Sequence, residues 1–426
     1  MQISTKKPLV LMVTAFLLCA VLFSVAGCKK TDSGSTQVTV NALFMKQAGY
    51  SESDVGAITE QFQKDHPNIK ITQTWVAYEE LQPKILASAG SGGYDIFPGD
   101  CIWTAQFAQA GLAKDLSDKV KTLNLSDVWQ GSLDAITYQG KYYGLPWLND
   151  VKYLFYNKRM LRDAGFNGPP KTWDELQTQA AAIKAKGLVT YPIAWCWSQA
   201  EALICDYTAV SGGFGGRFVD QNGNPTLDTA QNKAALDFMY GTIKSGLTNP
   251  QSLEMLEDDV LGTFVAGSAA FALNWTYMFN SAQDPSVSSV VGDVGIAAIP
   301  GTAAAKSATV NGGMSLMISS GSKNVDAAWE YMLYLSSQGV QAEYSKDALP
   351  IWKSLFDNDT VINTNPDIVP VAKVQYGYLV NRPMVPYYGQ LSTAMQVEIQ
   401  SVLLGSQSSD AALKNIQSTA EKLKLQ

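Results

Sequence analysis

The chain alternates short runs of apolar and β-branched residues with stretches in which apolar residues recur every three to four positions. Residues 37–44 (QVTVNALF) are typical of a strand, and residues 51–66 follow with helical spacing. The same order restarts after residue 150, where 152–157 (KYLFYN) predicts a strand and 169–187 a helix. Repeated strand–helix–strand alternation predicts an α/β fold in which helices cover parallel sheets.

The first residues have the features of an export signal. Lys6 and Lys7 precede an apolar run that ends in V-A-G-C. This run is short for a membrane-spanning helix, which needs roughly 20 apolar residues. V-A-G-C resembles a bacterial lipobox, so residues 1–27 would be a lipoprotein signal peptide and Cys28 the lipidated first residue of the mature chain. Residues 28–37 would then be a flexible tether. The alternative is an ordinary signal peptide that ends near a cysteine.

Charge changes the expected partners. Without residues 1–27, the 31 basic residues lose Lys6 and Lys7, which leaves 29 against 38 acidic residues and a formal charge of −9. Nucleic acid and anionic membrane surfaces both reward clustered Lys and Arg, so neither is expected as the main partner. The single histidine, His66, argues against His-based catalysis and His-rich metal sites. We therefore expect no cofactor and no metal.

Three cysteines would remain after export in addition to Cys28: Cys101, Cys196 and Cys205. A Cys196–Cys205 disulfide is conceivable in an oxidising compartment. Three buried free thiols are equally compatible with the sequence, so both possibilities stay open.

The length predicts two lobes, because single cores stop growing at roughly 250–300 residues. The alternation breaks near 144–151, 299–310 and 347–353, which are the expected crossings of the chain between the lobes. Lobes joined by several crossings would form a hinge. The expected bounds are 38–147 plus 308–350 for the N-lobe and 148–307 plus 351–426 for the C-lobe.

Aromatic residues beside loops at predicted strand ends are the first candidates for a site. In open α/β sheets, ligands bind beyond the carboxyl ends of strands. Flat aromatic faces suit the apolar C–H faces of a sugar ring, although each ring taken singly could belong to the core. The group comprises Trp75, Tyr78, Trp103, Trp147, Trp195, Trp197, Trp275, Tyr277, Tyr387 and Tyr388.

Charged candidates are fewer. Asp100 and Asp150 each offer two acceptor oxygens to a sugar diol, although Asp100 could simply cap the following helix. Glu52 and Glu79 stand at predicted helix starts, where the helix dipole already favours them. Arg382 lies between turn-forming residues, where its rigid fork suits a site that needs a permanently charged donor.

Gly312 and Gly313 open a predicted strand, and they either form a bulge or turn or expose bare backbone amides to a ligand.

Five segments resemble, in register, blocks of the bacterial carbohydrate-binding lipoproteins of ABC importers, the group of maltose- and trehalose/maltose-binding proteins. They are GYDIFPGDCIWTAQFAQAGLAKDLSD, YGLPWLNDVKYLFYNKRMLRDAGFNGPPKTWDEL, FVAGSAAFALNWTYMF, VNGGMSLMIS and NRPMVPYYGQLSTAMQVEIQSVLLG. The resemblance spans essentially the whole mature chain. It implies the two-lobed periplasmic-binding-protein-like fold (type II), with the ligand cleft between the lobes.

The resemblance also implies roles for individual residues. The chain would cross between the lobes at Trp147 to Asp150, with Asp100 and Asp150 holding sugar hydroxyls from opposite sides of the cleft. Leu148 departs from trehalose/maltose-type relatives, which often have a ring there. The expected ligand-binding residues are Asp100, Trp103, Asp150, Trp275, Tyr277, Gly312, Gly313, Arg382, Glu52, Tyr78 and Tyr387.

The function implied is the lipid-anchored binding component of an ABC importer, exported to the outer face of the cell membrane, or to the periplasmic side where an outer membrane is present. It would bind a di- or oligosaccharide as a monomer, close around it and deliver it to the permease. We expect no enzymatic activity. Two alternatives are an exported glycoside hydrolase, which would need two carboxylates about 5–9 Å apart, and a lipid-anchored adhesin, which would bind glycans without closure.

Overall fold

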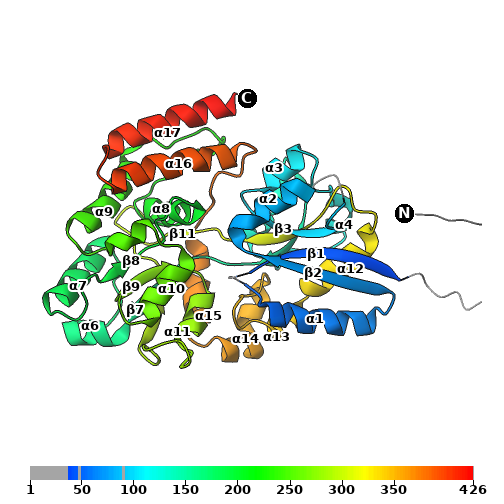
Figure 1. Cartoon of the computed structure of the whole chain (residues 1–426), viewed down its shortest axis with the longest axis horizontal. Helices are drawn as coiled ribbons and strands as arrows, with labels where there is room; N and C mark the ends of the chain where they lie inside the picture. Colours follow the sequence, from blue (N-terminus) through cyan, green and yellow to red (C-terminus); the bar gives the residue numbers. More distant parts are fainter. Residues whose placement is uncertain (1–36, 47–48, 89–91, 426) are drawn as a thin grey trace, which may run out of the picture. The chain divides into compact units, whose positions relative to one another are not determined.

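The structure is a computed structural model that describes residues 37–46, 49–88 and 92–425 (Figure 1). The predicted signal peptide, Cys28 and all but the last residue of the predicted tether lie outside these residues. Within the described ranges, every helix is too short or too polar to cross a membrane.

The first sheet has five strands in the order β2-β1-β3-β12-β6. Parallel pairing joins β1 to β2 and β3, as the alternation predicts, but β12 is antiparallel to both β3 and β6. The reason is the path of the chain, which enters β12 at the edge where β3 ends, so that Met314 pairs with Asp100. The bounds are β1 Val38–Met45, β2 Ile69–Val76, β3 Ile96–Asp100, β6 Leu145–Leu148 and β12 Met314–Ile318.

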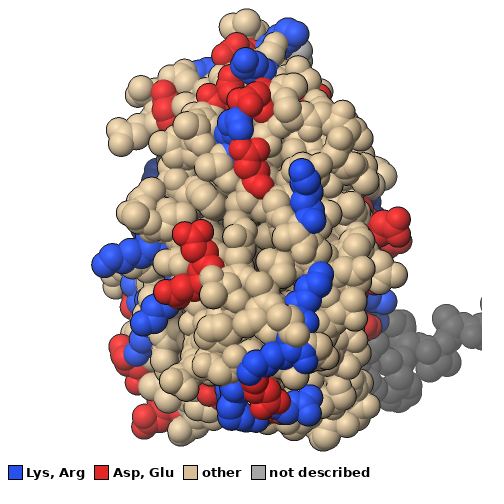
Figure 2. All heavy atoms as spheres, turned by 90° about the vertical axis from the view of Figure 1, so that its left-hand side faces the viewer, with Lys and Arg blue, Asp and Glu red and all other residues tan. Residues whose placement is uncertain are grey.

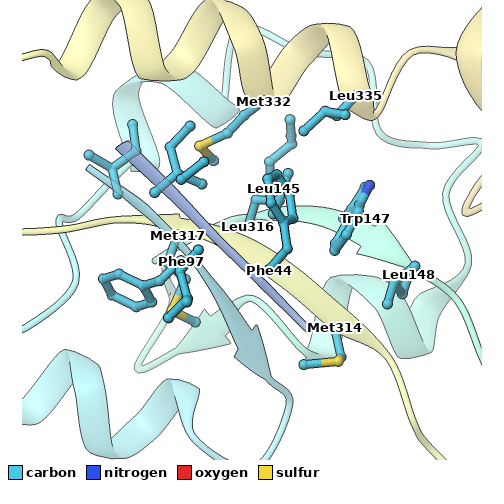
Figure 3. Packing of buried hydrophobic residues seen from close by; sticks show 14 of the residues in the cluster. Phe44, Phe97, Leu145, Trp147, Leu148, Met314, Leu316, Met317, Met332 and Leu335 are labelled. Atoms are coloured by element: carbon cyan, nitrogen blue, oxygen red, sulfur yellow. The ribbon is translucent and has the colours of Figure 1, made fainter. Parts of the chain in front are cut away.

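Buried side chains on this sheet form one core (Figure 3). Phe44, Leu316 and Met332 are fully buried, while Leu148 and Met314 lie near its margin and are 4–5% exposed. Ser51 caps the first helix by accepting a hydrogen bond from the Asp54 amide. The helices around this sheet are α1 Glu52–Asp65, α2 Tyr78–Ser88, α3 Thr104–Gln109, α4 Ser117–Val120, α5 Gln130–Asp134, α12 Val325–Leu335 and α13 Gln338–Glu343; β4 Thr137–Tyr138 and β5 Lys141–Tyr142 form a hairpin.

The second sheet has the order β10-β7-β9-β8 and is also mixed. β7 is antiparallel to β9 and β10, and β8 is parallel to β9. The bounds are β7 Tyr153–Asn157, β8 Ile193–Ala194, β9 Phe271–Asn274 and β10 Val294–Ala297. Two buried cores lie against this sheet, and Trp195 and Trp197 are fully buried in one of them, which makes them core residues.

Helices of the second lobe follow their sequence signals. Thr172 precedes a helix and caps it by accepting a hydrogen bond from the Glu175 amide, and the Glu175 carboxylate accepts from the Lys171 amide. The elements are α6 Lys158–Ala164, α7 Trp173–Ala185, α8 Glu201–Gly213, α9 Ala230–Lys244, α10 Glu257–Val265, α11 Tyr277–Ala282, α14 Asp359–Thr364, α15 Ile368–Gln375, α16 Tyr388–Leu403 and α17 Ser409–Lys424, with 3₁₀ turns η1 Pro250–Leu253, η2 Lys353–Asp357 and η3 Tyr376–Tyr378.

The chain passes between the two sheets three times. Residues 149–152 join β6 to β7, and residues 298–313 join β10 to β12 through β11 (Thr309–Val310), which pairs with β13 (Leu379–Val380). The third passage falls where Ala348 packs in the first core and Leu349 in a core of the second sheet. The lobe bounds given above remain a prediction.

Figure 2 shows one face of the molecule, on which Lys and Arg are interspersed with Asp and Glu over a mostly uncharged surface. This face carries no large patch of a single sign.

Candidate functional site

A cavity of about 130 Å³ is lined by residues from both lobes. A wider recess of about 670 Å³ shares Met45, Gly49 and Tyr277 with it. Seven of the predicted site residues line the inner cavity: Tyr78, Asp100, Asp150, Trp275, Tyr277, Gly312 and Arg382. Glu52 lines the outer recess instead, and Glu79, the other predicted helix-start carboxylate, lines the inner cavity.

An ion network centred on Arg382 joins the two lobes. Arg382 is 2% exposed, and its Nη2 lies 3.3 Å from Asp100 Oδ1, at the end of β3. Its Nη1 donates to Glu201 Oε1 at 2.7 Å, at the start of α8. Tyr388 and Ser392 also donate to the Glu201 carboxylate. A single guanidinium therefore holds one carboxylate from each lobe.

Tyr78 lines the cavity next to Asp100, and Trp103 supports it from behind. The Tyr78 hydroxyl donates to Asp100 Oδ2 at 2.7 Å, and its ring stacks on Trp103 with centroids 5.4 Å apart. Trp103 is 5% exposed and lies behind Tyr78, outside the residues that line the cavity. Trp103 therefore positions the Tyr78 ring and does not contact the cavity itself.

Asp150 lies at the first crossing between the lobes. Its Oδ1 accepts from the Val151 amide and from both the amide and the hydroxyl of Thr276. Its backbone carbonyl accepts from the Gly312 amide at 3.0 Å, which ties the first crossing to the second. Burial raises the pKa of the Asp150 carboxyl to about 7, against the opposing effect of these hydrogen bonds.

Trp275 is fixed from two sides. Its Nε1 donates to Glu257 Oε1 at 3.2 Å, and Lys152 Nζ lies 5.2 Å from its ring centroid. A Cβ at Gly312 would come within 2.3 Å of the ring, so only glycine allows this approach of the ring to the backbone. Beside it, the Tyr277 hydroxyl donates to Asp258 Oδ1 at 3.1 Å.

Lys152 and Asp206 form a buried ion pair behind Trp275. Both side chains are 0% exposed, and Lys152 Nζ lies 2.7 Å from Asp206 Oδ1 and 3.4 Å from Glu257 Oε1. The second Asp206 oxygen accepts from the Cys196 amide. The orientation of Glu257, and through it of Trp275, thus depends on a buried lysine.

The remaining predicted residues lie outside the lining of the inner cavity. Gly313 is buried, and its amide donates to Asn311 Oδ1. Tyr387 is half-buried against the second-lobe core. Leu148 lines the cavity and is 4% exposed, so an aliphatic side chain takes the place at which the resemblance implies a ring.

The three described cysteines are buried free thiols. The possible Cys196–Cys205 disulfide is therefore absent from this structure. Burial raises the pKa of the Cys205 thiol to about 12. In the part of the chain that the structure describes, no group of three or more His, Cys, Asp or Glu side chains is arranged to hold a metal ion.

Sequence reasoning missed Glu201, Glu257, Asp258 and Lys152. Glu201, Glu257 and Asp258 are acids in the first turn of a helix, which is where the helix dipole favours any acid. Lys152 left a clearer signal, because a lysine inside an otherwise apolar run is rarely buried without a partner.

Replacement of Asp150 by asparagine is expected to remove a pH-dependent contribution to stability. The pKa of this carboxyl is about 7 in the folded protein against the usual 3.8. As pH rises from about 4 to 7, the unfolded chain loses this proton first, so the contribution of Asp150 to the free energy of unfolding falls. Urea unfolding of the wild type and of Asp150→Asn across this range measures it. The free energy of unfolding of the wild type minus that of the variant should decrease as pH rises. A difference that stays constant or rises with pH would contradict the raised pKa of Asp150.

These features define a class of protein. The cavity offers charge-assisted acceptors, one arginine fork and three aromatic rings, and it lies where two lobes meet at several chain crossings. Such a site can bind a polar solute with apolar faces between lobes that close around it.

Comparisons with known proteins agree with this class. The family model described as bacterial extracellular solute-binding protein matches residues 47–342, and the chain belongs to that family. A probable ABC transporter-binding protein of Deinococcus radiodurans is 28% identical over 79% of this chain and 81% of its own length. The maltotriose-binding protein of Pyrococcus abyssi is 25% identical over 85% of this chain and 77% of its own length.

Solved structures agree on the fold. Maltose-bound MalE3 of T. maritima superposes with a TM-score of 0.82 at 26% identity, covering 91% of this chain and 99% of that one. A solute-binding protein of Thermotoga lettingae bound to α-D-tagatose gives 0.82 at 25% identity, covering 90% and 99%. The predicted two-lobed fold is confirmed. The family consists of solute-binding proteins without catalytic activity, so the chain is a binding protein and not an enzyme.

Proposed function

We propose that the protein is the lipid-anchored binding component of an ABC importer that takes up a di- or oligosaccharide. The observation that carries the proposal is the cavity between the lobes, where Asp100, Asp150 and Arg382 lie beside Trp275 and Tyr277. Carboxylates and a guanidinium suit sugar hydroxyls, and the rings suit the C–H faces. The similarity to a maltotriose-binding protein and to maltose-bound MalE3 supports this solute class.

The size of the site favours more than one sugar unit. The inner cavity suits one terminal ring, and the outer recess, which shares Tyr277 with it, leaves room for further units. Asp150 and Tyr277 would then contact the ring nearest the crossings. The closed form would be the one that the permease recognises.

Thermal unfolding of the chain from residue 31 onward, against a panel of mono-, di- and trisaccharides, tests the proposal. A ligand at 100 times its dissociation constant adds about 2.7 kcal/mol to stability. For lobes of this size, that is a shift of several degrees. The shift should disappear in Asp150→Ala and persist in Asp326→Ala, which removes a carboxylate that is 88% exposed. A shift that survives Asp150→Ala would contradict the assigned site.

The anchor has its own test. Cells fed labelled palmitate should label the wild-type chain, whereas Cys28→Ala should carry no label and leave the membrane fraction. A membrane-bound Cys28→Ala protein would contradict lipidation at this residue.

A further inference from the structure

The inner cavity holds many more carboxylates than cations. Among its lining residues, Arg382 is the one cation, and six are carboxylates. The cavity is identified as a site by its volume, its aromatic walls and the family of the chain, so the charge balance bears on which solute it takes. The six carboxylates are Glu79, Asp100, Asp150, Glu201, Glu257 and Asp258.

The nearby cations do not offset this excess. Arg382 is shared between Asp100 and Glu201, so these three side chains together carry one uncompensated negative charge. Lys152 is shared in the same way between Asp206 and Glu257. Each of the two buried networks therefore has a net charge of −1.

Asp150 is a further acidic group of the cavity, and its three hydrogen bonds come from neutral donors, the Val151 amide and the amide and hydroxyl of Thr276. All three go to Oδ1. With a pKa of about 7, the Asp150 carboxyl is partly ionised near neutral pH. Asp150 lines the cavity, so Oδ2 is the oxygen that remains for a solute.

The outer recess is also lined by more acidic than basic side chains. Lys46 and Lys346 line it, but so do Glu52, Asp284 and Asp347. A solute that enters through the recess therefore meets net negative charge along its whole path. Such a path raises the local concentration of cations and disfavours anions.

A neutral sugar and a cationic one would respond differently to this environment. Hydroxyl groups can donate hydrogen bonds to the carboxylates, but they leave the like charges uncompensated. A protonated amine donates hydrogen bonds to the carboxylates and also compensates their negative charge. The faces of Trp275 and Tyr277 offer it a further, cation–π attraction. Burial raises the pKa of Asp150 to about 7 in the empty site, and a cation placed against this carboxyl would favour its ionised form.

We infer that the solute is a sugar that carries a protonated amine, an amino sugar or an amine-bearing oligosaccharide. This inference rests on the proposed sugar-binding function and narrows its solute class. The amine would lie against Asp150 Oδ2 at the inner end of the cavity, and the neutral hydroxyls would face Asp100 and Arg382.

Calorimetric titration with matched sugar pairs tests the inference on the mature chain. The pairs are glucosamine against glucose, galactosamine against galactose, and the chitosan disaccharide against both cellobiose and its own N,N′-diacetylated form. The acetylated form keeps the rings and the linkage and removes the charge. We expect the amine of at least one pair to bind more than about tenfold tighter than its neutral partner, and the preference to shrink as salt is added.

Variants test which carboxylates cause the preference for amine-bearing over neutral sugars. Asp150→Asn and Glu257→Gln keep the shape of each side chain and should each reduce the amine preference several-fold, whereas Asp326→Asn should leave it unchanged. Neutral sugars that bind as tightly as their amine partners would overturn the inference and leave the proposed function standing. If no sugar of either kind binds, the inference and the proposed function both fall. The wild-type titrations decide between these outcomes even if a variant does not fold.

Discussion

Replacement of Lys152 by methionine is expected to lower the free energy of unfolding by about 3–5 kcal/mol, because it leaves a buried carboxylate without its counter-charge. Lys152 and Asp206 are both 0% exposed, and the ammonium lies 2.7 Å from Asp206 Oδ1. Methionine fills a similar volume, so the loss would come from the charge and not from a cavity. Urea unfolding with a tryptophan fluorescence readout measures it.

The chain offers a matched control for this substitution. Lys373 lies 2.6 Å from Asp357 Oδ1, but the two side chains are 41% and 79% exposed. Lys373→Met should cost no more than about 1 kcal/mol. The double variant Lys152→Met/Asp206→Leu should recover most of the loss, because it removes both charges. Equal losses for Lys152→Met and Lys373→Met would contradict the buried pair.

Replacement of Arg382 by methionine is expected to cost a similar amount, about 3–5 kcal/mol, and also to separate the lobes. Asp100 and Glu201 come from different lobes, and Arg382 holds both. Without it, the two carboxylates lose the counter-charge that they share and repel each other. Small-angle scattering of the ligand-free variant should give a larger radius of gyration than the wild type.

Arg382→Lys separates charge from geometry. Lysine keeps the positive charge but has one ammonium in place of the fork, so it should restore stability in part and hold only one of the two carboxylates. If Arg382→Met were as compact as the wild type, the Arg382 network would not be what holds the lobes together.

The elements of the fold could be predicted from the sequence, but not all of the strand directions. Strand–helix alternation predicts α/β layers and the parallel pairing of β1 with β2 and β3. It gives no information on β12, which returns from the second lobe and enters the first sheet in the opposite direction. Strand direction there depends on where the chain crosses between the lobes, and local patterning does not encode that.

Some residues of the site could be predicted from the sequence, and others could not. Asp100, Asp150 and Trp275 stand next to strand ends, and topology brings strand ends together, so their positions are informative. Glu201 and Glu257 stand at helix starts, where acids are common for reasons unrelated to ligands. Trp195 and Trp197 show the converse case, because they follow a short strand and yet are fully buried in the core.

The central position of β12 has a consequence for the order in which the chain can fold. β12 lies between β3 and β6, so the first sheet is split in two until residues 314–318 have been synthesised. An N-terminal fragment would expose the unpaired edges of both strands, which is an unstable arrangement that favours aggregation. The first lobe therefore cannot complete its core while most of the second lobe is still being made. The export proposed for this chain would benefit from such a delay, because a chain that completes its core late is more easily kept unfolded until it reaches the export machinery.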